Sequence, residues 1–517
     1  MPSTDALTKR SHIFEFFLQN KAYCFDFLFK KFKLKLLLAL PLNKEAKQRW
    51  EKEKAADHFS FHTKLQYFSL NTISPSFCSA KWLQLTLNLQ NGTNHSCHHP
   101  APHKIPLEEI KNDPKALHNT KFKKRQRKLM LKGERPNECD YCWRIEDLKT
   151  ERISDRIYKS FDPKWSSNNL DRVFNAKDTG NLAPSYLEVS FENTCNLKCG
   201  YCGPENSSTW AQEIRKFGPY PTSYSHGDLD QLEATGKKVI RHNDENLYLE
   251  AFWQWWPELY KSLNTLRITG GEPLLSSSTW RVFEFLKDNP RSALDLAINS
   301  NLSVSDENID RLIKDINEME NKIEAFTVFT SCEAKAEQAE YIRYGLDYSK
   351  LLSNVKKILE NTSDKCSVSF MVTFNALSVT TFLDFLDDFK SLRLKYPRKD
   401  GKNRVFLMIS YLRWPVHMSA QTLPFEIKQD YAAKTLLYIK QNSIKYNTEG
   451  FLHNSEVDQL ERLCDFMLSE SSGIDLNKAH HDFGKFFQEY DRRKGTRFAA
   501  VFPPLARHFE KCAQLNE

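Results

Sequence analysis

The feature that most constrains the fold is a series of six strand-like runs separated by helical stretches. Each run is short and nearly all apolar, and the intervening segments, such as 279–288 and 382–392, have the helical period. The runs are Leu187–Glu192, Thr265–Thr269, Leu294–Asn299, Ala325–Thr330, Val368–Phe374 and Val405–Leu412. Strands that are apolar throughout are typical of parallel sheets with both faces covered. The sequence therefore predicts an α/β domain with a parallel sheet that is buried on both faces.

Three cysteines follow the first of these runs in C-x3-C-x2-C spacing: Cys195, Cys199 and Cys202. Thiolates are the usual protein ligands of iron–sulfur clusters, and short spacers let one loop surround a single cluster. Three ligands on a four-iron cluster leave one iron open for chemistry. The spacing alone leaves two alternatives open, a catalytic zinc site and plain buried thiols.

A second motif, Gly270-Gly271-Glu272-Pro273, follows the second run. Paired glycines at a strand end let backbone groups approach a ligand with no Cβ in the way. Together the two motifs resemble those of the radical S-adenosylmethionine (radical SAM) superfamily. The resemblance implies a partial (β/α)6 TIM-like barrel with its site at the C-terminal ends of the strands. It also implies a [4Fe–4S] cluster on the three cysteines, with SAM on the fourth iron.

The resemblance further implies individual contacts to SAM. Glycines 270 and 271 with Glu272 and Pro273 would hold its amino group, and Ser300 with Asn301 would lie near its ribose. Ser331 and Arg343 resemble positions that bind its carboxylate, for which a hydroxyl and a guanidinium are chemically suited. For these two residues the alternative is a strand-end cap and a surface ion pair.

The aromatic residue before the third cysteine, Tyr201, also fits the family pattern. The chain departs from that pattern at two positions, since Ser300 stands where Thr is usual and Glu333 stands where Asp is usual. The expected cofactor-binding residues are therefore Tyr201, Gly270, Gly271, Glu272, Pro273, Ser300, Asn301, Ser331 and Arg343.

Four further cysteines lie N-terminal to the predicted barrel in two pairs. Cys78 and Cys97 flank an alternating run, 82–92, that predicts a strand entering an Asn-Gly turn, and Cys139 and Cys142 form a C-x2-C. The C-x13-G-x4-C spacing through Gly92 resembles the opening of twitch and SPASM domains. It implies an auxiliary [4Fe–4S] cluster in an N-terminal twitch-like domain.

Two alternatives remain open for these four cysteines. A structural zinc ion could use the same thiols, because zinc and iron–sulfur clusters share ligand types. Histidines beside Cys97 could also substitute as ligands, although a histidine in a surface loop usually has no such role. These are His95, His98, His99 and His103.

A basic run, 121–135, lies between the two cysteine pairs and carries eight basic residues and one acidic residue. Such a run with a helical period could bind a nucleic acid or another polyanion. A helix with a solvated basic face is favoured, because no aromatic or groove-reading pattern accompanies the charge.

The chain divides by composition into five parts. A basic helical extension is followed by the twitch-like domain, a polar linker, the radical SAM partial barrel and a helical, polar C-terminal region. The predicted bounds are 1–74, 75–158, 159–183, 184–420 and 421–517.

Composition and charge narrow the expected setting. Twelve cysteines without a secretory leader predict a reducing, cytoplasmic compartment. The apolar stretch Leu36–Leu40 is far shorter than the roughly 20 residues that span a membrane, so no span is predicted. A net charge of +8, from 74 basic and 66 acidic residues, does not by itself imply nucleic-acid binding.

The resemblance implies a radical enzyme of the oxidoreductase or maturase type that cleaves SAM and abstracts hydrogen from a substrate. It implies a flavodoxin- or ferredoxin-type reductant, and electron transfer as the role of the auxiliary cluster. A peptide or protein substrate is expected, with a sugar or aminoglycoside-like small molecule as the alternative. A zinc-stabilised nucleic-acid-binding protein is a distant alternative, because it leaves the Cys195 triad and the Gly-Gly-Glu-Pro motif unexplained.

Overall fold

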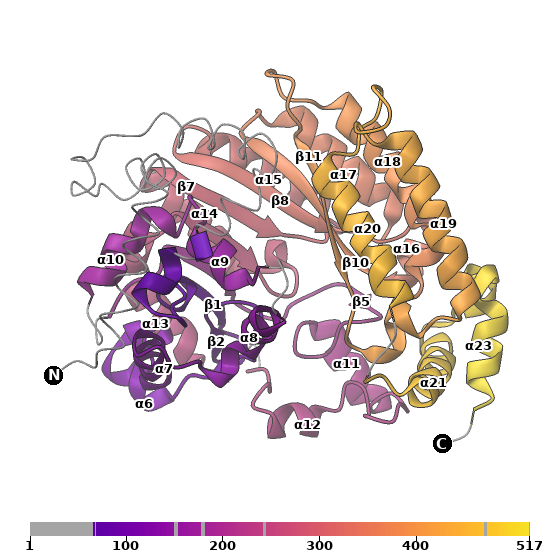
Figure 1. The fold of residues 1–517 in the computed structure, drawn as a ribbon, viewed down its shortest axis with the longest axis horizontal. Helices are drawn as coiled ribbons and strands as arrows, with labels where there is room; N and C mark the ends of the chain where they lie inside the picture. Colours follow the sequence, from indigo (N-terminus) through magenta and orange to yellow (C-terminus); the bar gives the residue numbers. More distant parts are fainter. Residues whose placement is uncertain are drawn as a thin grey trace, which may run out of the picture.

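The structure is a computed structural model that describes residues 66–148 except 68, and residues 153–176, 181–240, 244–469 and 473–515. Within these residues the chain forms a nine-stranded sheet in the order β11-β10-β8-β7-β6-β4-β1-β2-β3 (Figure 1). Most of the predicted N-terminal extension, 1–74, lies outside the described residues. Among the described helices, none is both long enough and apolar enough to cross a membrane.

Each of the six predicted runs forms a strand, and the six strands pair in chain order. All five pairings between them are parallel, from β4 with β6 to β10 with β11. The strands are β4 (Tyr186–Ser190), β6 (Thr265–Thr269), β7 (Arg291–Asn299), β8 (Ile323–Ser331), β10 (Cys366–Phe374) and β11 (Val405–Tyr411). The predicted α/β class and parallel sheet are confirmed.

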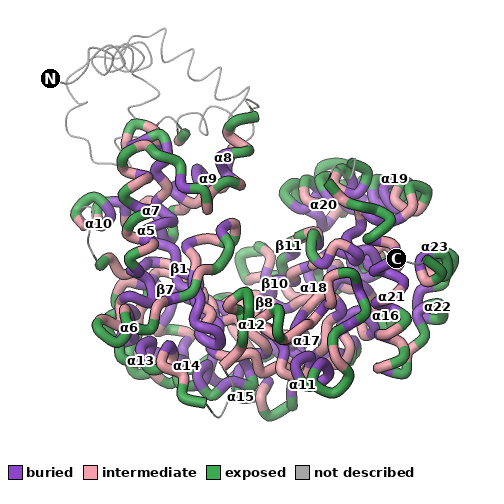
Figure 2. Tube along the Cα trace, turned by 90° about the horizontal axis from the view of Figure 1, so that it is seen from below, coloured by how far each residue is buried: buried purple, intermediate pink, exposed green. Residues whose placement is uncertain are grey.

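Helices connect these strands and cover one face of the sheet. Phe283 of α14 contacts Phe326 of β8, and Phe385 and Phe389 of α18 contact Phe370 of β10. In Figure 2 the chain forms an arc, with α13, α14, α15 and α17 outside and β8, β10 and β11 toward its inner side. The connecting helices are α13 (Leu247–Leu259), α14 (Ser277–Asp288), α15 (Asp306–Met319), α16 (Ala336–Ile342), α17 (Tyr348–Asn361) and α18 (Phe382–Lys395).

The other face of the sheet remains partly accessible, so the prediction that both faces are buried is wrong. Along β6, Leu266 and Ile268 are buried, whereas Arg267 between them is only partly buried. On β11, Phe406 and Met408 are 41% and 47% exposed. The prediction failed because successive side chains of a strand point to opposite faces of the sheet. Apolar residues such as Phe406 and Met408 can occupy the open face, so an all-apolar strand does not require that both faces be covered.

The N-terminal cysteine region continues the same sheet. The predicted strand and Asn-Gly turn are present as β1 (Gln84–Asn88), β2 (Thr93–His95) and a turn in which Gly92 has φ +62°. β1 pairs in parallel with β4, so this hairpin extends the sheet beyond the first predicted run. β2 also pairs antiparallel with β3 (His103–Lys104).

Short helices complete this region, and all of them except the one at 107–112, whose Ile110 belongs to the main core, form a second hydrophobic core around Phe77, Trp82 and Trp143. They are α5 (Ala80–Leu83), α6 (Leu107–Asn112), α7 (Lys121–Leu131), α8 (Asp140–Asp147) and α9 (Asp155–Ser160). Part of the segment expected as a linker also packs here, since Trp165 and Leu170 belong to this core and 170–175 form α10 (Leu170–Asn175).

The crossover between β4 and β6 is long, as expected, and contains α11 (Ser208–Phe217) and α12 (Leu229–Ala234) before α13. The C-terminal region is helical, also as expected. Its helices are α19 (Phe425–Asn442), α20 (Asn454–Leu468), α21 (Leu476–Lys494), α22 (Phe498–Val501) and α23 (Ala506–Ala513). They lie at the end of the arc opposite the N-terminal cysteine region (Figure 2).

Candidate functional site

The loop after β4 carries Cys195, Cys199 and Cys202, and the backbone of each cysteine is held by a side chain from the first crossover. The Cys195 N–H donates to Ser208 Oγ over 3.1 Å. Trp210 Nε1 donates to the Cys199 carbonyl over 3.0 Å, and His226 Nε2 lies 3.1 Å from the Cys202 carbonyl. Three local anchors thus fix the course of one short loop.

A second segment reaches the same loop from beyond β8. Two short strands, β5 (Lys198–Cys199) and β9 (Arg343–Tyr344), pair antiparallel and place Cys199 opposite Arg343. The Gly200 N–H also donates to the Ile342 carbonyl over 2.8 Å. The cysteine loop is therefore hydrogen-bonded on one side to the first crossover and on the other to the segment that carries Arg343.

Burial dominates the chemistry of the three thiols. It raises the pKa of Cys195 to about 12 and also raises the pKa values of Cys199 and Cys202. A nucleophilic cysteine needs the opposite shift, toward thiolate at neutral pH. Thiols in such a setting ionise when a bound metal compensates the charge, so the loop suits metal ligation better than covalent catalysis.

Arg343 lies beside this loop in a buried ion pair, which corrects the surface ion pair given as its alternative. Its Nε and Nη2 donate to Glu333 Oε2 over 3.0 and 2.8 Å, and the two side chains are 7% and 1% exposed. Its Nη1 also lies 3.6 Å from Cys199 Sγ, and its Nη2 bonds the Tyr201 hydroxyl. Arg343, Glu333 and Tyr201 therefore form one polar group against the cysteine loop.

We predict that Arg343→Met lowers the free energy of unfolding by about 3–5 kcal/mol, because it leaves the Glu333 carboxylate buried without its partner. The double variant Arg343→Met/Glu333→Gln should recover a large part of this loss. Comparing the melting temperatures of the two variants by calorimetry tests the prediction. Equal melting temperatures for both would contradict it.

The Gly-Gly-Glu-Pro motif packs directly on the backbone that leads to Cys195. A Cβ on Gly271 would lie 2.3 Å from the Thr194 carbonyl oxygen, and Gly270 has φ +125°. The Gly271 and Glu272 N–H groups donate to the carbonyls of Glu192 and Thr194 over 3.2 and 2.6 Å. The paired glycines thus allow two loops to touch, a role that the sequence argument assigned to a ligand instead.

We predict that Gly271→Ala separates these loops and costs about 1–3 kcal/mol, as expected for an overpacked site. Gly200→Ala is the matched control, because its Cβ would make only ordinary contact with Met418 Cε at 3.5 Å. The iron bound after anaerobic reconstitution should fall in the Gly271 variant and stay unchanged in the control. Equal iron content in both variants would show that close approach of the loops is not required.

The carboxylate of Glu272 is buried and accepts three hydrogen bonds. It accepts from Ser300 Oγ at 2.8 Å, from the Asn301 N–H at 2.7 Å and from the Leu274 N–H at 3.0 Å. Burial raises its pKa to about 7, against the effect of these donors. Three of the residues expected near SAM are therefore joined to one another.

The remaining expected SAM contacts lie close by. The Asn301 amide donates to Asn196 Oδ1 in the cysteine loop over 2.9 Å. Ser331 is the last residue of β8 and lies opposite Met371 of β10. Pro273 is buried and begins the short helical turn after Glu272. The ends of β4, β6, β7 and β8 thus bring these residues to one edge of the sheet.

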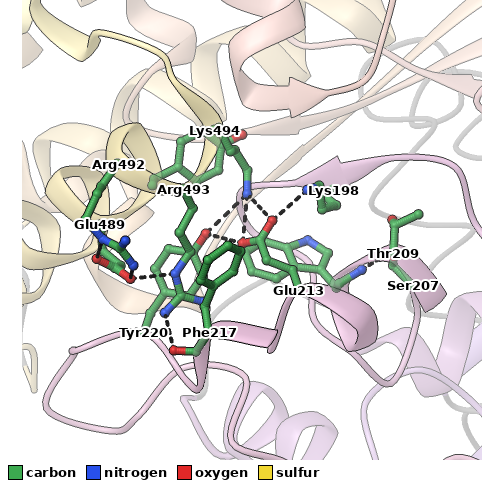
Figure 3. A network of polar contacts seen from close by, with 12 residues as sticks. Lys198, Ser207, Thr209, Glu213, Phe217, Tyr220, Glu489, Arg492, Arg493 and Lys494 are labelled. Atoms are coloured by element: carbon green, nitrogen blue, oxygen red, sulfur yellow. Dashed lines mark hydrogen bonds and ion pairs between the residues drawn. The ribbon is translucent and has the colours of Figure 1, made fainter. Parts of the chain in front are cut away.

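The C-terminal helix α21 also reaches the cysteine loop, which the sequence argument missed. Glu213 of α11 accepts from Lys198 in the loop at 2.6 Å and from Lys494 of α21 at 2.9 Å (Figure 3). Lys494 lies 292 positions after Cys202 in a polar region, so no local pattern marks it. The packing of α21 on the loop could not be foreseen from periodicity.

The four N-terminal cysteines form a second site. Cys78, Cys97, Cys139 and Cys142 all line one partly open cavity of about 20 Å³. Burial raises the pKa of Cys78, and raises those of Cys139 and Cys142 to about 12. Among the described residues, no three His, Cys, Asp or Glu side chains converge as ligands of a single metal ion do. The same holds for the three thiols of the loop after β4.

Cations surround this cavity together with the thiols. Lys81, Arg156 and Lys159 are among its lining residues, and Lys81 Nζ is 2.7 Å from Glu138 Oε1. Burial lowers the pKa of Lys81, but the Cys139 thiol and Glu138 outweigh burial, and the net shift is upward. Of the four neighbouring histidines, His99 lines the cavity, where its Nε2 lies 2.7 Å from Asp155 Oδ2.

The basic run does form a helix, α7, but the interpretation as a solvated face holds for only part of it. Lys121, Arg125 and Lys128 are exposed, whereas Lys123 and Arg127 are buried. Both buried cations contact His118 over 2.9 Å, and burial lowers the pKa of that imidazole well below its usual value. A neutral histidine accepts at one ring nitrogen only, so Nδ1 accepts from Lys123 while Nε2 donates to the Trp82 carbonyl over 2.8 Å. Arg127 also donates to the Lys81 carbonyl and to Asn119 Oδ1, so two of the basic residues hold the local fold.

Comparison with known proteins gives a partial match. No family model matches the chain. The GTP 3',8-cyclase of Alkaliphilus metalliredigens (strain QYMF) is 28% identical over 125 residues, which is 24% of this chain and 30% of the cyclase. The chain therefore matches less than a third of that relative's length.

Among solved structures, Streptococcus suis SuiB bound to S-adenosylmethionine has a TM-score of 0.30 and 13% identity, with 72% of each chain covered. SuiB bound to the precursor peptide SuiA has a TM-score of 0.28 and 13% identity, over 70% of this chain and 69% of SuiB. These TM-scores are too low to carry an argument. The sequence similarity to the cyclase supports the radical SAM superfamily, in agreement with the cysteine and glycine motifs.

Proposed function

We propose that this protein is a radical SAM enzyme with a partial (β/α)6 barrel, a SAM-binding [4Fe–4S] cluster and an auxiliary [4Fe–4S] cluster. The observation that carries the proposal is the convergence of two motifs far apart in sequence. The Gly-Gly-Glu-Pro turn packs on the backbone before Cys195, and Arg343 and Tyr201 lie against Cys199. A plain set of buried thiols would not need this arrangement at the carboxyl edge of a parallel sheet.

Cys195, Cys199 and Cys202 would hold the first cluster, and the residues around Glu272, Ser300, Asn301, Ser331 and Arg343 would form the SAM site. Bound at these residues, the cluster and SAM would supply radical chemistry that removes a hydrogen atom from a substrate carbon. The chain's own contribution is to fix the loop through Ser208, Trp210 and His226.

The accessible face of the sheet supports a place for the substrate next to that site. Arg267 lies on this face, 4.3 Å from the ring of Phe329 on β8, and its Nε donates to Asn299 Oδ1 over 2.8 Å. Its neighbour Glu188 lies within 3.8 Å, on the strand that leads to the cysteine loop. Charged, polar and aromatic side chains on one open face suit substrate binding, since a face with only a structural role is normally covered.

Cys78, Cys97, Cys139 and Cys142 would hold the auxiliary cluster. The resemblance of the C-x13-G-x4-C spacing to twitch domains supports a cluster here, and a structural zinc ion on the same four thiols is the alternative. Lys81, Arg156 and Lys159 line the cavity, and each of them is paired with a carboxylate, so their charges are already balanced by the protein. With four protein thiols available, electron transfer is the proposed role, and a flavodoxin- or ferredoxin-type protein is the proposed reductant.

We propose a peptide or protein as the substrate, because twitch-like domains accompany such modifications. The cyclase similarity favours the alternative, a small molecule, since that relative's name describes a nucleotide reaction. The proposed reaction takes place in the cytoplasm.

The proposed function is tested by incubating the anaerobically reconstituted protein with SAM and dithionite. Formation of 5′-deoxyadenosine and methionine that requires dithionite supports the proposal. An iron-loaded protein that forms neither product would overturn it. A protein that takes up only zinc and binds DNA or RNA with a steep salt dependence would instead support the nucleic-acid-binding alternative.

A further inference from the structure

The strongest unexplained feature of the structure is a buried lysine at the end of α21. The Lys494 side chain is 0% exposed, and its Nζ donates to Glu213 Oε1 and Oε2 over 3.0 and 2.9 Å. It also lies 3.2 Å from the Tyr220 hydroxyl. Figure 3 shows this ammonium group and that of Lys198 meeting at the same carboxylate. A lysine is rarely buried completely without a specific partner.

Lys494 is linked to the backbone around Cys199 through Glu213 and Trp210. Glu213 accepts from Lys198, the residue before Cys199, over 2.6 Å. The Lys494 ammonium also lies 4.9 Å from the ring of Trp210, whose Nε1 holds the Cys199 carbonyl. One buried cation therefore contacts the ring that holds the Cys199 carbonyl and the carboxylate that holds the Lys198 side chain.

A third contact comes from the same helix. The ring of Tyr490 is 4.2 Å from the Lys494 ammonium, and its hydroxyl donates to the Tyr341 carbonyl over 2.7 Å. Tyr341 lies two residues before Arg343, in the segment that pairs with the cysteine loop. Helix α21 thus supports both strands of the short β5–β9 pair.

Charge balance indicates why a lysine occupies this position. Lys198 and Lys494 bring two positive charges to the one carboxylate of Glu213, which leaves a net charge of +1 in a largely buried group. An uncompensated buried cation is costly. Thiolate ligands at Cys195, Cys199 and Cys202, in the loop that also carries Lys198, would supply negative charge. The excess cation and the anionic cluster site would then stabilise each other.

We propose that Lys494 is a positioning residue for the SAM-binding cluster: it holds Glu213, Lys198 and Trp210 against the cysteine loop, and its charge favours the reduced state of the cluster. This inference rests on the proposed function, because it assumes a cluster at Cys195, Cys199 and Cys202. It extends that function by making the C-terminal region part of the redox site, in addition to the barrel.

The test is an EPR-monitored redox titration of the full-length reconstituted protein, following the signal that changes when SAM is added. Lys494→Met removes one positive charge, so the ratio of reduced to oxidised cluster at a fixed potential should fall at least tenfold, or about 59 mV for one electron. Glu213→Gln removes one negative charge and should shift the ratio the other way. Lys494→Arg should restore most of the wild-type ratio.

Lys478→Met is the matched control, because Lys478 lies on the same helix with an exposed side chain. A role limited to folding predicts no opposite shifts, so shifts of the same sign in the Lys494→Met and Glu213→Gln variants would overturn the inference, as would unchanged ratios. If Lys494→Met loses the cluster, recovery in Lys494→Arg supports positioning, and failure to recover contradicts it.

The two proposals fail differently in this experiment. A wild-type protein without a SAM-responsive signal would overturn the proposed function and this inference with it. A wild-type protein with that signal, and variants that leave its potential unchanged, would overturn this inference alone.

Discussion

Cys199→Ala should abolish dithionite-dependent cleavage of SAM and remove about four irons per chain. Cys199 is the central ligand of the proposed site, since its backbone pairs with Arg343 and its sulfur lies 3.6 Å from that guanidinium. Two remaining thiols cannot hold a cluster that needs three, and SAM then has no iron to bind. The measurement is 5′-deoxyadenosine formed per chain, together with iron and sulfide content.

Cys464→Ala is the control for this substitution. Cys464 is a buried thiol on α20 outside both cysteine sites, so its removal should leave SAM cleavage and iron content unchanged. Wild-type rates of SAM cleavage in Cys199→Ala would contradict the assignment of the cluster to this loop.

Cys142→Ala should have a different effect, namely loss of the auxiliary cluster with SAM cleavage retained. Cys142 lies on α8 and lines the N-terminal cavity together with Cys78 before α5, Cys97 after β2 and Cys139 before α8, all of them outside the loop after β4. The variant should lose about four irons. It should still form 5′-deoxyadenosine, but without coupling this to substrate oxidation, because the proposed electron acceptor is gone.

Iron and zinc should be measured together in this variant. Unchanged iron content in Cys142→Ala would overturn the auxiliary-cluster proposal. Loss of one zinc ion without loss of iron would replace that proposal with the structural zinc alternative.

Local sequence patterns predicted much of the fold because they reflect local physics. The six strands were found from apolar runs bounded by turns, and the hairpin was found from alternation and an Asn-Gly turn. The accessible face of the sheet was not predicted, because Phe406 and Met408 read as core residues although they are exposed. Periodicity shows that a strand has two faces, but it does not show whether a helix covers each of them.

The candidate site was predicted through its motifs, and its supporting residues were not. The spacing of Cys195, Cys199 and Cys202 marks one loop, and Gly270 with Gly271 marks the loop that packs on it. Lys494, by contrast, acts through a tertiary contact with Glu213 that no local pattern encodes. Arg127 in the basic run shows the same limit, because its burial depends on how α7 packs.

The most direct test of the central claim is the iron and acid-labile sulfide content of the wild-type protein after anaerobic reconstitution. Two [4Fe–4S] clusters predict about eight irons and eight sulfides per chain, accompanied by dithionite-dependent formation of 5′-deoxyadenosine from SAM. A chain that binds zinc alone, with neither sulfide nor SAM cleavage, would contradict the account.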